Sequence, residues 1–168
     1  MVEVTREGSM AVYKELLKNP PPGPEVPHKP PRPDLVSLDG RSVVSIVRSN
    51  SRVEGINEAV WLAGGFRPIV HGTEGEILIK PNCNTDDPYP TDTHPETIRT
   101  IAEGLISAGV SKERIVVGEI SGRARGLPTR HTVENLGIKA VAEELGIGLC
   151  YFDEGEWVTV KAPNREAW

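Results

Sequence analysis

The chain has 168 residues, with 24 acidic against 19 basic side chains and a net charge of −5. This length suits one domain, and the acidic balance argues against a nucleic-acid-binding protein, which carries a basic surplus to neutralise phosphates. No apolar run approaches the roughly 20 residues that cross a bilayer, and no stretch near the N-terminus resembles a secretory signal. We therefore expect a cytoplasmic protein without nucleic-acid or membrane partners.

Residues 1–40 differ in composition from the rest and are expected to form an N-terminal arm. Residues 11–18 can form a short helix, which is marginal in water by itself. Residues 20–33 hold eight prolines in fourteen positions, and proline fixes φ and removes an amide donor. We expect an extended polyproline II segment. An arm lying on its own domain or on a partner subunit is favoured over a ligand for a proline-binding domain.

Residues 41–168 alternate between short apolar runs and amphipathic stretches, which indicates an α/β domain. β-branched residues predict a first strand at 43–47, and apolar side chains at helical spacing predict a helix at 53–63. Three further strands and two further helices follow in alternation. The strands are predicted at 77–79, 115–118 and 147–152, and the helices at 98–106 and, broken near Gly137, at 133–145.

The helix that contains residues 98–106 has the clearest boundaries in the sequence. Pro95 stands in its first turn, where a missing amide donor costs nothing. Thr93 and Glu96 have the spacing of a capping box, and Gly109 ends the helix.

The resulting order, β-α-β-α-β-α-β, predicts a Rossmann-like three-layer sandwich with a mostly parallel sheet, covered by helices on both faces. In such sheets ligands collect at the carboxyl ends of the strands. Two loops begin there and exceed the roughly 2–6 residues of a plain connection. They are the predicted site.

The first loop, residues 78–95, offers a cation and several polar side chains. Lys80 precedes a proline, which favours an extended backbone and places its ammonium at the mouth of the sheet, where it can pair an anionic small molecule. The following helix N-terminus also favours an anion. Asn82 can bind a ligand or its own turn, and the loop's small and acidic residues are equally well explained as turn and cap residues.

The same loop suggests a metal or a reactive thiol. An ammonium near Cys83 would lower its pKa, and Cys83 could bind a metal with His94 and a carboxylate such as Asp92 or Glu119. The spacing matches no zinc template, so an inert thiol is the alternative. Cys150 reads as a small core residue.

The second loop, residues 118–132, carries Arg123, Arg125 and Arg130 among glycines. Arginine forks suit phosphate or carboxylate, and glycines allow close approach of the backbone. The alternative is a solvated loop paired with carboxylates. Glu119 could bind a metal or act as a base, although a salt bridge to one of these arginines is the simpler expectation. Neither a Walker A loop nor a dinucleotide fingerprint is present.

These loops and their flanking elements resemble the DUF362 family, a domain of unknown function. The resemblance spans about residues 43–161 and rests on the order and spacing of several short motifs together. They are Ile79-Lys80-Pro81-Asn82, Thr91-Asp92 with Pro95-Glu96, Ala108-Gly109, Val117-Gly118-Glu119, and Gly137-Ile138 through Ala142 to Gly146.

The resemblance implies an uncharacterised protein, since the family has no established general reaction and some members are associated with iron–sulfur clusters. Cys83 and Cys150 are too few for a cluster-binding set. The chain resembles the N-terminal half of the family pattern, so we expect a fragment, a split-gene half that needs a second chain, or a shortened relative that completes its sheet as a homo-oligomer. Three hypotheses follow: an anion or metal site, a non-catalytic assembly module, or the partner of an iron–sulfur redox protein.

Overall fold

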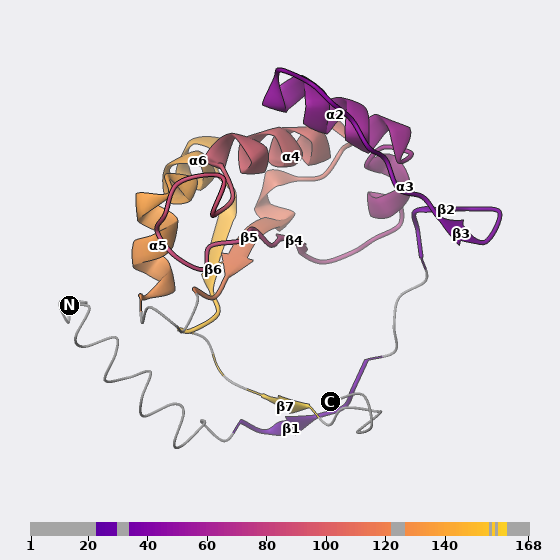
Figure 1. The fold of residues 1–168 in the computed structure, drawn as a ribbon. Coiled ribbons are helices and arrows are strands. Elements are labelled where there is room, and N and C mark those ends of the chain that lie inside the picture. Colours follow the sequence, from indigo (N-terminus) through magenta and orange to yellow (C-terminus); the bar gives the residue numbers. More distant parts are fainter. Residues whose placement is uncertain (1–22, 30–33, 122–126, 155, 157, 161–168) are drawn as a thin grey trace.

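The computed structural model describes residues 23–29, 34–121, 127–154, 156 and 158–160 (Figure 1). At its centre lies a three-stranded parallel sheet in the order β4-β5-β6. It consists of β4 (Ile77–Ile79), β5 (Ile115–Glu119) and β6 (Gly148–Tyr151). These are three of the four strands that the apolar runs predicted, and together with the helices between them they confirm an α/β fold with a parallel sheet.

Helices connect these strands as the sequence predicted. The connection from β4 to β5 contains α4 (Pro95–Ser107), and the connection from β5 to β6 contains α5 (Thr129–Asn135) and α6 (Ile138–Leu145). Gly137 separates α5 from α6 with a left-handed φ of 75°, which glycine adopts without the cost that other residues bear. The predicted break in this helix is therefore confirmed.

Helices α4 and α6 lie over one face of the sheet (Figure 1). The strand order never reverses, so two right-handed crossovers place their helices on the same side. Ile79 and Val117 are buried on that side, whereas Leu78 is half exposed and Cys150 is exposed. The predicted second helical layer is not found among the described residues, and the prediction of Cys150 as a core residue is wrong.

Helix α2 (Arg52–Leu62) confirms the helix predicted at 53–63 and begins at Ser51, whose hydroxyl accepts from the Glu54 amide at 3.3 Å. It packs on α4 rather than against the sheet, and none of its side chains is buried. The short α3 (Arg67–Val70) follows it. Helix α2 thus forms an outer layer over α4.

The prediction of a strand at residues 43–47 is wrong. This stretch follows a two-stranded antiparallel hairpin of β2 (Ser37–Leu38) and β3 (Arg41–Ser42) and pairs with no described strand. Its β-branched residues favour an extended backbone, but a strand also needs a neighbour whose amides and carbonyls face its own. The central sheet consequently has three strands in the described part of the chain, not four.

The proline-rich arm meets the C-terminal part of the chain. Its residues Glu25–Val26 form β1, which pairs in parallel with β7 (Thr159–Val160), and the Thr159 amide donates to the Pro24 carbonyl at 3.0 Å. The predicted helix at 11–18 lies outside the described residues, as does half of the segment predicted as polyproline II, residues 20–22 and 30–33.

The hydrophobic core lies between the sheet and the helices on its covered face. Within the described ranges, no helix is long and apolar enough to cross a bilayer. The core residues are Ile79, Cys83, Ile98, Ala102, Leu105, Val110, Ile115, Val117, Val133, Ile138, Val141, Ala142 and Ile147.

Candidate functional site

Lys80 and Glu119 meet at the carboxyl edge of the sheet. Ile79 lies opposite Val117 in the β4–β5 register, so the residue after β4 and the end of β5 reach the same edge. The Lys80 ammonium donates to Glu119 Oε2 at 2.5 Å, and the Ile120 amide donates to Glu119 Oε1 at 2.8 Å. The side chain of Glu119 is 3% exposed and that of Lys80 is 57% exposed.

This pairing explains how a carboxylate can be buried at the end of a strand. An unpaired buried charge costs several kcal/mol, but both oxygens of Glu119 accept hydrogen bonds. Lysine has three N–H donors, and no other described residue accepts from the Lys80 ammonium. The arrangement fixes a cation at the strand ends with donors still directed to solvent. The described partner of Glu119 is Lys80, whereas the expected salt bridge to Arg123 or Arg125 falls on residues outside the described part of the chain.

Asp92 and Asn82 hold the first loop in shape. Asp92 is buried, and its Oδ1 accepts from the Asn84 amide at 2.9 Å while its Oδ2 accepts from the Thr85 hydroxyl at 2.7 Å. The Asn82 side-chain amide donates to the Thr91 carbonyl at 3.1 Å and to Asp92 Oδ1 at 3.2 Å. Both side-chain donors of Asn82 are therefore used within the loop, which corresponds to the turn alternative.

His94, another predicted metal ligand, begins α4. Its Nδ1 accepts from the Glu96 amide at 3.1 Å, and its ring meets the edge of the Tyr89 ring at 6.0 Å between centroids. The predicted capping role of Thr93 is wrong, because the Thr93 hydroxyl instead accepts from the Asn82 amide at 2.8 Å. A histidine cap satisfies one of the free amides at the helix start.

Cys83 is fully buried beneath this edge. Burial raises the pKa of its thiol to about 12, and the carboxylates of Glu119 and Asp92 act in the same direction, while Lys80 opposes them. The Lys80 ammonium does act to lower this pKa, as predicted, but the expected reactive thiol is wrong, because desolvation of the thiolate is the larger effect and the net shift is upward.

The predicted metal ligands do not form a common coordination shell. Among the residues that the structure describes, no three His, Cys, Asp or Glu side chains are placed to hold a metal ion. Glu119 is engaged by Lys80, Asp92 by the loop and His94 by α4. A metal role for Cys83, Asp92, His94 and Glu119 stays a prediction that this arrangement does not support.

Hydrogen bonds join the two sides of the second loop at the end of β5. The Ser121 hydroxyl donates to the Leu127 carbonyl, and the Ser121 amide donates to Thr129 Oγ1 at 2.9 Å. Arg123 and Arg125 lie between these anchors, in residues 122–126, outside the described part of the chain. The chain enters and leaves the arginine stretch directly after β5, two residues beyond Glu119.

Sequence reasoning missed three polar residues at this edge. Ser121 and Thr129 are buried, and the Thr129 amide donates to Asp153 Oδ2 at 3.1 Å, which ties α5 to the end of β6. Thr129 follows a proline at a helix start, a pattern that marks helix N-termini and could have identified it. Ser121 and Asp153 follow strand ends, a signal too common to single them out.

Arg130, predicted as a ligand residue, is held by other groups. Its guanidinium donates to both carboxylate oxygens of Glu154, at 2.8 and 2.6 Å, and lies 4.4 Å from the centroid of the Tyr151 ring. The hydrogen bond to Arg130 lowers the pKa of Glu154, against the opposing effect of burial. The two carboxylate oxygens take donors that an anionic ligand would need.

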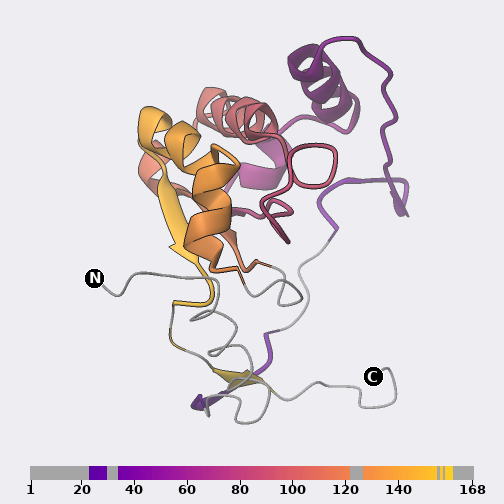
Figure 2. The same cartoon turned by 60° about the vertical axis from the view of Figure 1, so that its left-hand side comes forward.

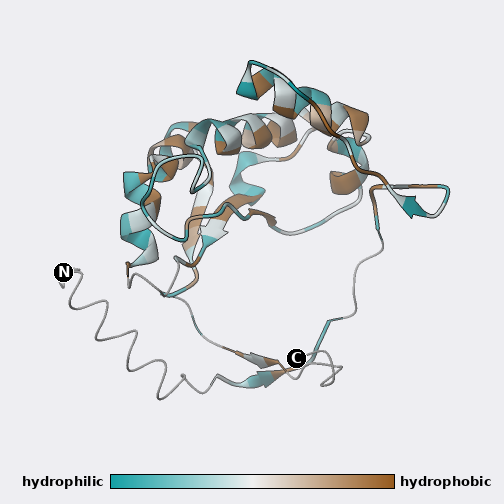
Figure 3. Ribbon diagram, in the orientation of Figure 1, coloured by the Kyte–Doolittle hydropathy of each residue, from teal (hydrophilic) through white to brown (hydrophobic). Residues whose placement is uncertain are grey.

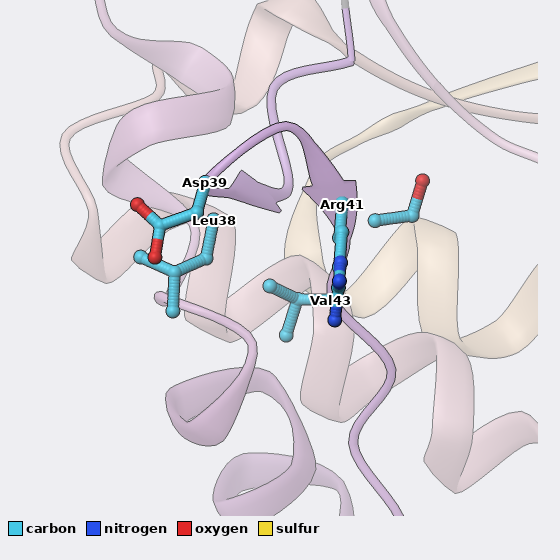
Figure 4. A pocket seen from close by; sticks show the side chains of 5 residues that line it. Leu38, Asp39, Arg41 and Val43 are labelled. Carbon is cyan, nitrogen blue, oxygen red and sulfur yellow. The ribbon is translucent and has the colours of Figure 1, made fainter.

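An open hollow of about 550 Å³ lies at the β2–β3 hairpin (Figure 4). None of the residues that line the hollow is buried. They are Leu38, Asp39, Arg41, Ser42 and Val43. It contains none of the predicted site residues. The chemistry-bearing side chains gather instead at the sheet edge, where Lys80 and Glu119 meet.

The fold and this edge define an α/β protein that carries its polar groups at the carboxyl ends of parallel strands. The family described as a domain of unknown function, DUF362, matches residues 77–167, more than half of the chain. The chain therefore belongs to the DUF362 family, as its motifs predicted. Residues 43–76, which the resemblance had included, lie outside the match. No curated protein and no solved structure matches the chain.

Proposed function

We propose that the carboxyl edge of the parallel sheet binds a small anionic ligand, with Lys80 as its fixed cation. The observation that carries this proposal is the pair of Lys80 and Glu119. A buried carboxylate holds the ammonium at 2.5 Å, yet more than half of the lysine side chain is exposed. The pairing satisfies the buried carboxylate and uses only one of the three N–H donors of the lysine, so the other donors remain available to an anion.

The neighbouring loop would supply the charge that the pair lacks. Lys80 and Glu119 together are neutral, so an anion needs at least one further cation nearby. Arg123 and Arg125 belong to a stretch whose two ends, Ser121 and Leu127, are joined by a hydrogen bond at the end of β5. Arginine binds phosphate and carboxylate groups through paired N–H donors. This chain connectivity supports a ligand of that class.

The function proposed for this edge is binding of an anion, without a chemical reaction. Ligands of parallel sheets bind outside the carboxyl ends of their strands. Glu119 ends β5, and Lys80 and the arginine stretch follow the ends of β4 and β5. Cys83 contributes no nucleophile near neutral pH, because its thiol pKa is raised to about 12. The proposed ligand is therefore defined by its charge rather than by a bond that the protein would form or break.

The test uses inorganic phosphate and citrate as probes of the full chain. Isothermal titration and the shift in melting temperature measure binding to the wild type, to Lys80→Ala and to Arg123→Ala. We expect each substitution to weaken binding by about tenfold or more, because each removes one charged hydrogen bond worth about 1.5–3 kcal/mol. Lys80→Arg should keep part of the affinity.

Lys139→Ala provides the matched control, because Lys139 also pairs with a glutamate, Glu134, at 3.3 Å but lies on α6. It should leave binding unchanged. Lys80→Ala leaves the buried carboxylate of Glu119 without its cation, which destabilises the fold. The double variant Lys80→Met with Glu119→Gln therefore removes the Lys80 charge without leaving an unpaired buried charge. Equal affinities in the wild type, the double variant and Arg123→Ala would refute the proposal, and so would failure of the wild type to bind either probe.

A further inference from the structure

The stretch of residues 43–47 has the side-chain pattern of a strand but no partner. Val44 is 80% and Ile46 is 90% exposed, whereas Val43, Ser45 and Val47 are half buried. Such alternation at a period of two is typical of a strand that packs on one side. Figure 3 shows that this stretch is largely hydrophobic, so a sequence suited to a sheet lies at the surface of the molecule.

The backbone of this stretch is equally unpaired. The Val43 amide donates to the Val36 carbonyl at 2.9 Å within the hairpin, and residues 44–47 make no hydrogen bond to another described residue. Backbone amides and carbonyls are strong hydrogen-bonding groups that a sheet edge can satisfy. The backbone amides and carbonyls of these four residues are therefore available to pair with a neighbouring strand.

Strand β4 presents the complementary feature. It pairs with β5 along one edge, and no described strand lies along its other edge. β4 is short, but its residues Ile77, Leu78 and Ile79 are all apolar, and Leu78 is half exposed. A free sheet edge and an unpaired strand thus occur in the described part of the same chain.

We propose that residues 43–47 of one chain add to the free edge of β4 in a second copy of this chain. In both views of the ribbon, the stretch runs on the outer side of α2, away from β5 and β6 (Figures 1 and 2). A second copy is the occupant that supplies both missing features without another component, since each copy provides one strand and one edge. Two copies exchanging strands reciprocally form a closed dimer.

Large apolar side chains are also exposed on the elements that precede and follow the stretch in the chain. They are Leu38 on the hairpin and Trp61 and Leu62 on α2, and their burial against a second copy would add to the stability of the dimer. The exchange would give each central sheet a fourth strand from a second copy. It concerns the side edge of β4 rather than the carboxyl end where Lys80 lies, and it does not depend on ligand binding.

The decisive experiment maps contacts between copies of the full chain. A photo-reactive benzoylphenylalanine at position 46 is introduced, isotopically heavy and light proteins are mixed and irradiated, and the cross-linked peptides are identified by mass spectrometry. We expect mixed heavy–light pairs that join position 46 to the peptide containing Ile77–Ile79. Pairs of equal isotope alone would mean pairing within one chain, and mixed pairs at other peptides would mean another interface. Either result overturns the proposal.

Matched substitutions test the same contact through the dimer dissociation constant, measured by analytical ultracentrifugation. Ile46→Asp should raise it by about tenfold or more, because the charge would be buried at the interface. Val158→Asp, an equally apolar but distant exposed position, should change it less than about twofold. A protein that is monomeric at every concentration, or equal effects of both substitutions, would contradict the strand exchange.

Two proline variants separate strand pairing from general apolar association. Successive residues of a strand direct their amides to opposite edges, so Val44→Pro and Ser45→Pro remove donors from different edges. Proline is compatible with an extended, unpaired backbone, and circular dichroism should confirm that both variants fold. We expect one to weaken the dimer by about tenfold or more and the other to have little effect. Equal effects of both would exclude a ladder.

Discussion

Residues 34–70 and residues 77–151 are both rich in apolar side chains, yet they are packed very differently. Every described buried side chain lies between Ile79 and Ile147, whereas the first region contains none. Most of the large apolar side chains that are exposed belong to the first region. The difference follows from the sheet, because β4, β5 and β6 give the helices a surface on which to close a core.

The first region is attached to this core by few side chains. Phe66 and Val70 are half buried and pack against the core cluster, and α2 rests on α4. An amphipathic helix gains most of its stability from the surface that it covers, so α2 depends on α4 rather than on a core of its own. Apolar side chains therefore stabilise this fold only where a second layer of structure packs against them.

The largest effect that tests this comparison is the loss of one isoleucine from each region. Ile98→Ala empties a side-chain position that is 1% exposed and should cost about 2–5 kcal/mol of unfolding free energy. Ile46→Ala should change it by less than about 0.5 kcal/mol, since that side chain touches little. Urea unfolding of both variants under monomeric conditions measures this, and equal costs would mean that residues 34–70 possess a core.

The two cysteines sharpen the comparison within the packed region itself. Cys83 is buried under the covered face, and Cys150 is exposed on the open one. Because the pKa of Cys83 is raised to about 12 and its sulfur is inaccessible, iodoacetamide at pH 8 should modify Cys150 at least about tenfold faster. Mass spectrometry of peptides over time gives both rates, with Cys150→Ser as control. Rapid modification of Cys83 would show that the loop above it opens.

The raised pKa of Cys83 also gives a direction for stability at alkaline pH. Folded Cys83 keeps its proton above the ordinary value of 9.0, up to about 12, while the unfolded chain has already lost it. The folded state then binds more protons, so stability is complete below pH 9 and falls as the pH rises towards 12. Cys83→Ala should remove this part of the decline.

The sequence predicted the packed region well because local patterns there agree with the final contacts. The helix at α4, the break at Gly137 and the strands at β4, β5 and β6 each carried a clear periodicity or turn residue. Residues 43–47 carried an equally clear strand pattern, but a strand is completed by a neighbour, and no local pattern reveals whether that neighbour is available. The prediction of a second helical layer failed because the face that each helix covers depends on the order of the strands in the sheet. Hydrophobic periodicity does not reveal that order.

The candidate site was predictable in place but not in detail. Strand ends and loop lengths indicated the edge where Lys80 and Glu119 meet. The roles of Asp92, Asn82 and His94 depend on which atoms come within hydrogen-bonding distance, as in the Asn82 amide that donates to Asp92 at 3.2 Å. The thiol of Cys83 was misjudged because its burial, which only packing determines, outweighs the nearby ammonium.

A smaller effect tests the junction between the two regions. A side chain at Gly104 on α4 would overlap the Phe66 ring, so Gly104→Ala should displace Phe66 and reduce amide protection in α2 and α3. Alanine favours the helix by about 1 kcal/mol, which should keep α4 and α6 protected. Hydrogen exchange resolved by peptide measures this. Ser107→Ala, an exposed position on the same helix, is the control and should leave α2 unchanged.

The smallest expected effect comes from the ion pair of Arg130 and Glu154 on the surface of the packed region. Its hydrogen bond lowers the pKa of Glu154, so the unfolded chain takes up a proton first as the pH falls. The pair therefore stabilises the fold above the ordinary glutamate pKa of 4.5, and this contribution is lost as the pH drops through the lowered value.

Glu154→Gln should therefore cost little at pH 7 and nothing at the acid limit, because both side chains are about half exposed and such pairs are weak and screened by salt. Thermal unfolding of this variant and the wild type between pH 3 and pH 7 measures the difference. A loss at pH 7 as large as that of Ile98→Ala would mean that charge pairing, rather than the apolar core beneath the sheet, distinguishes the two regions.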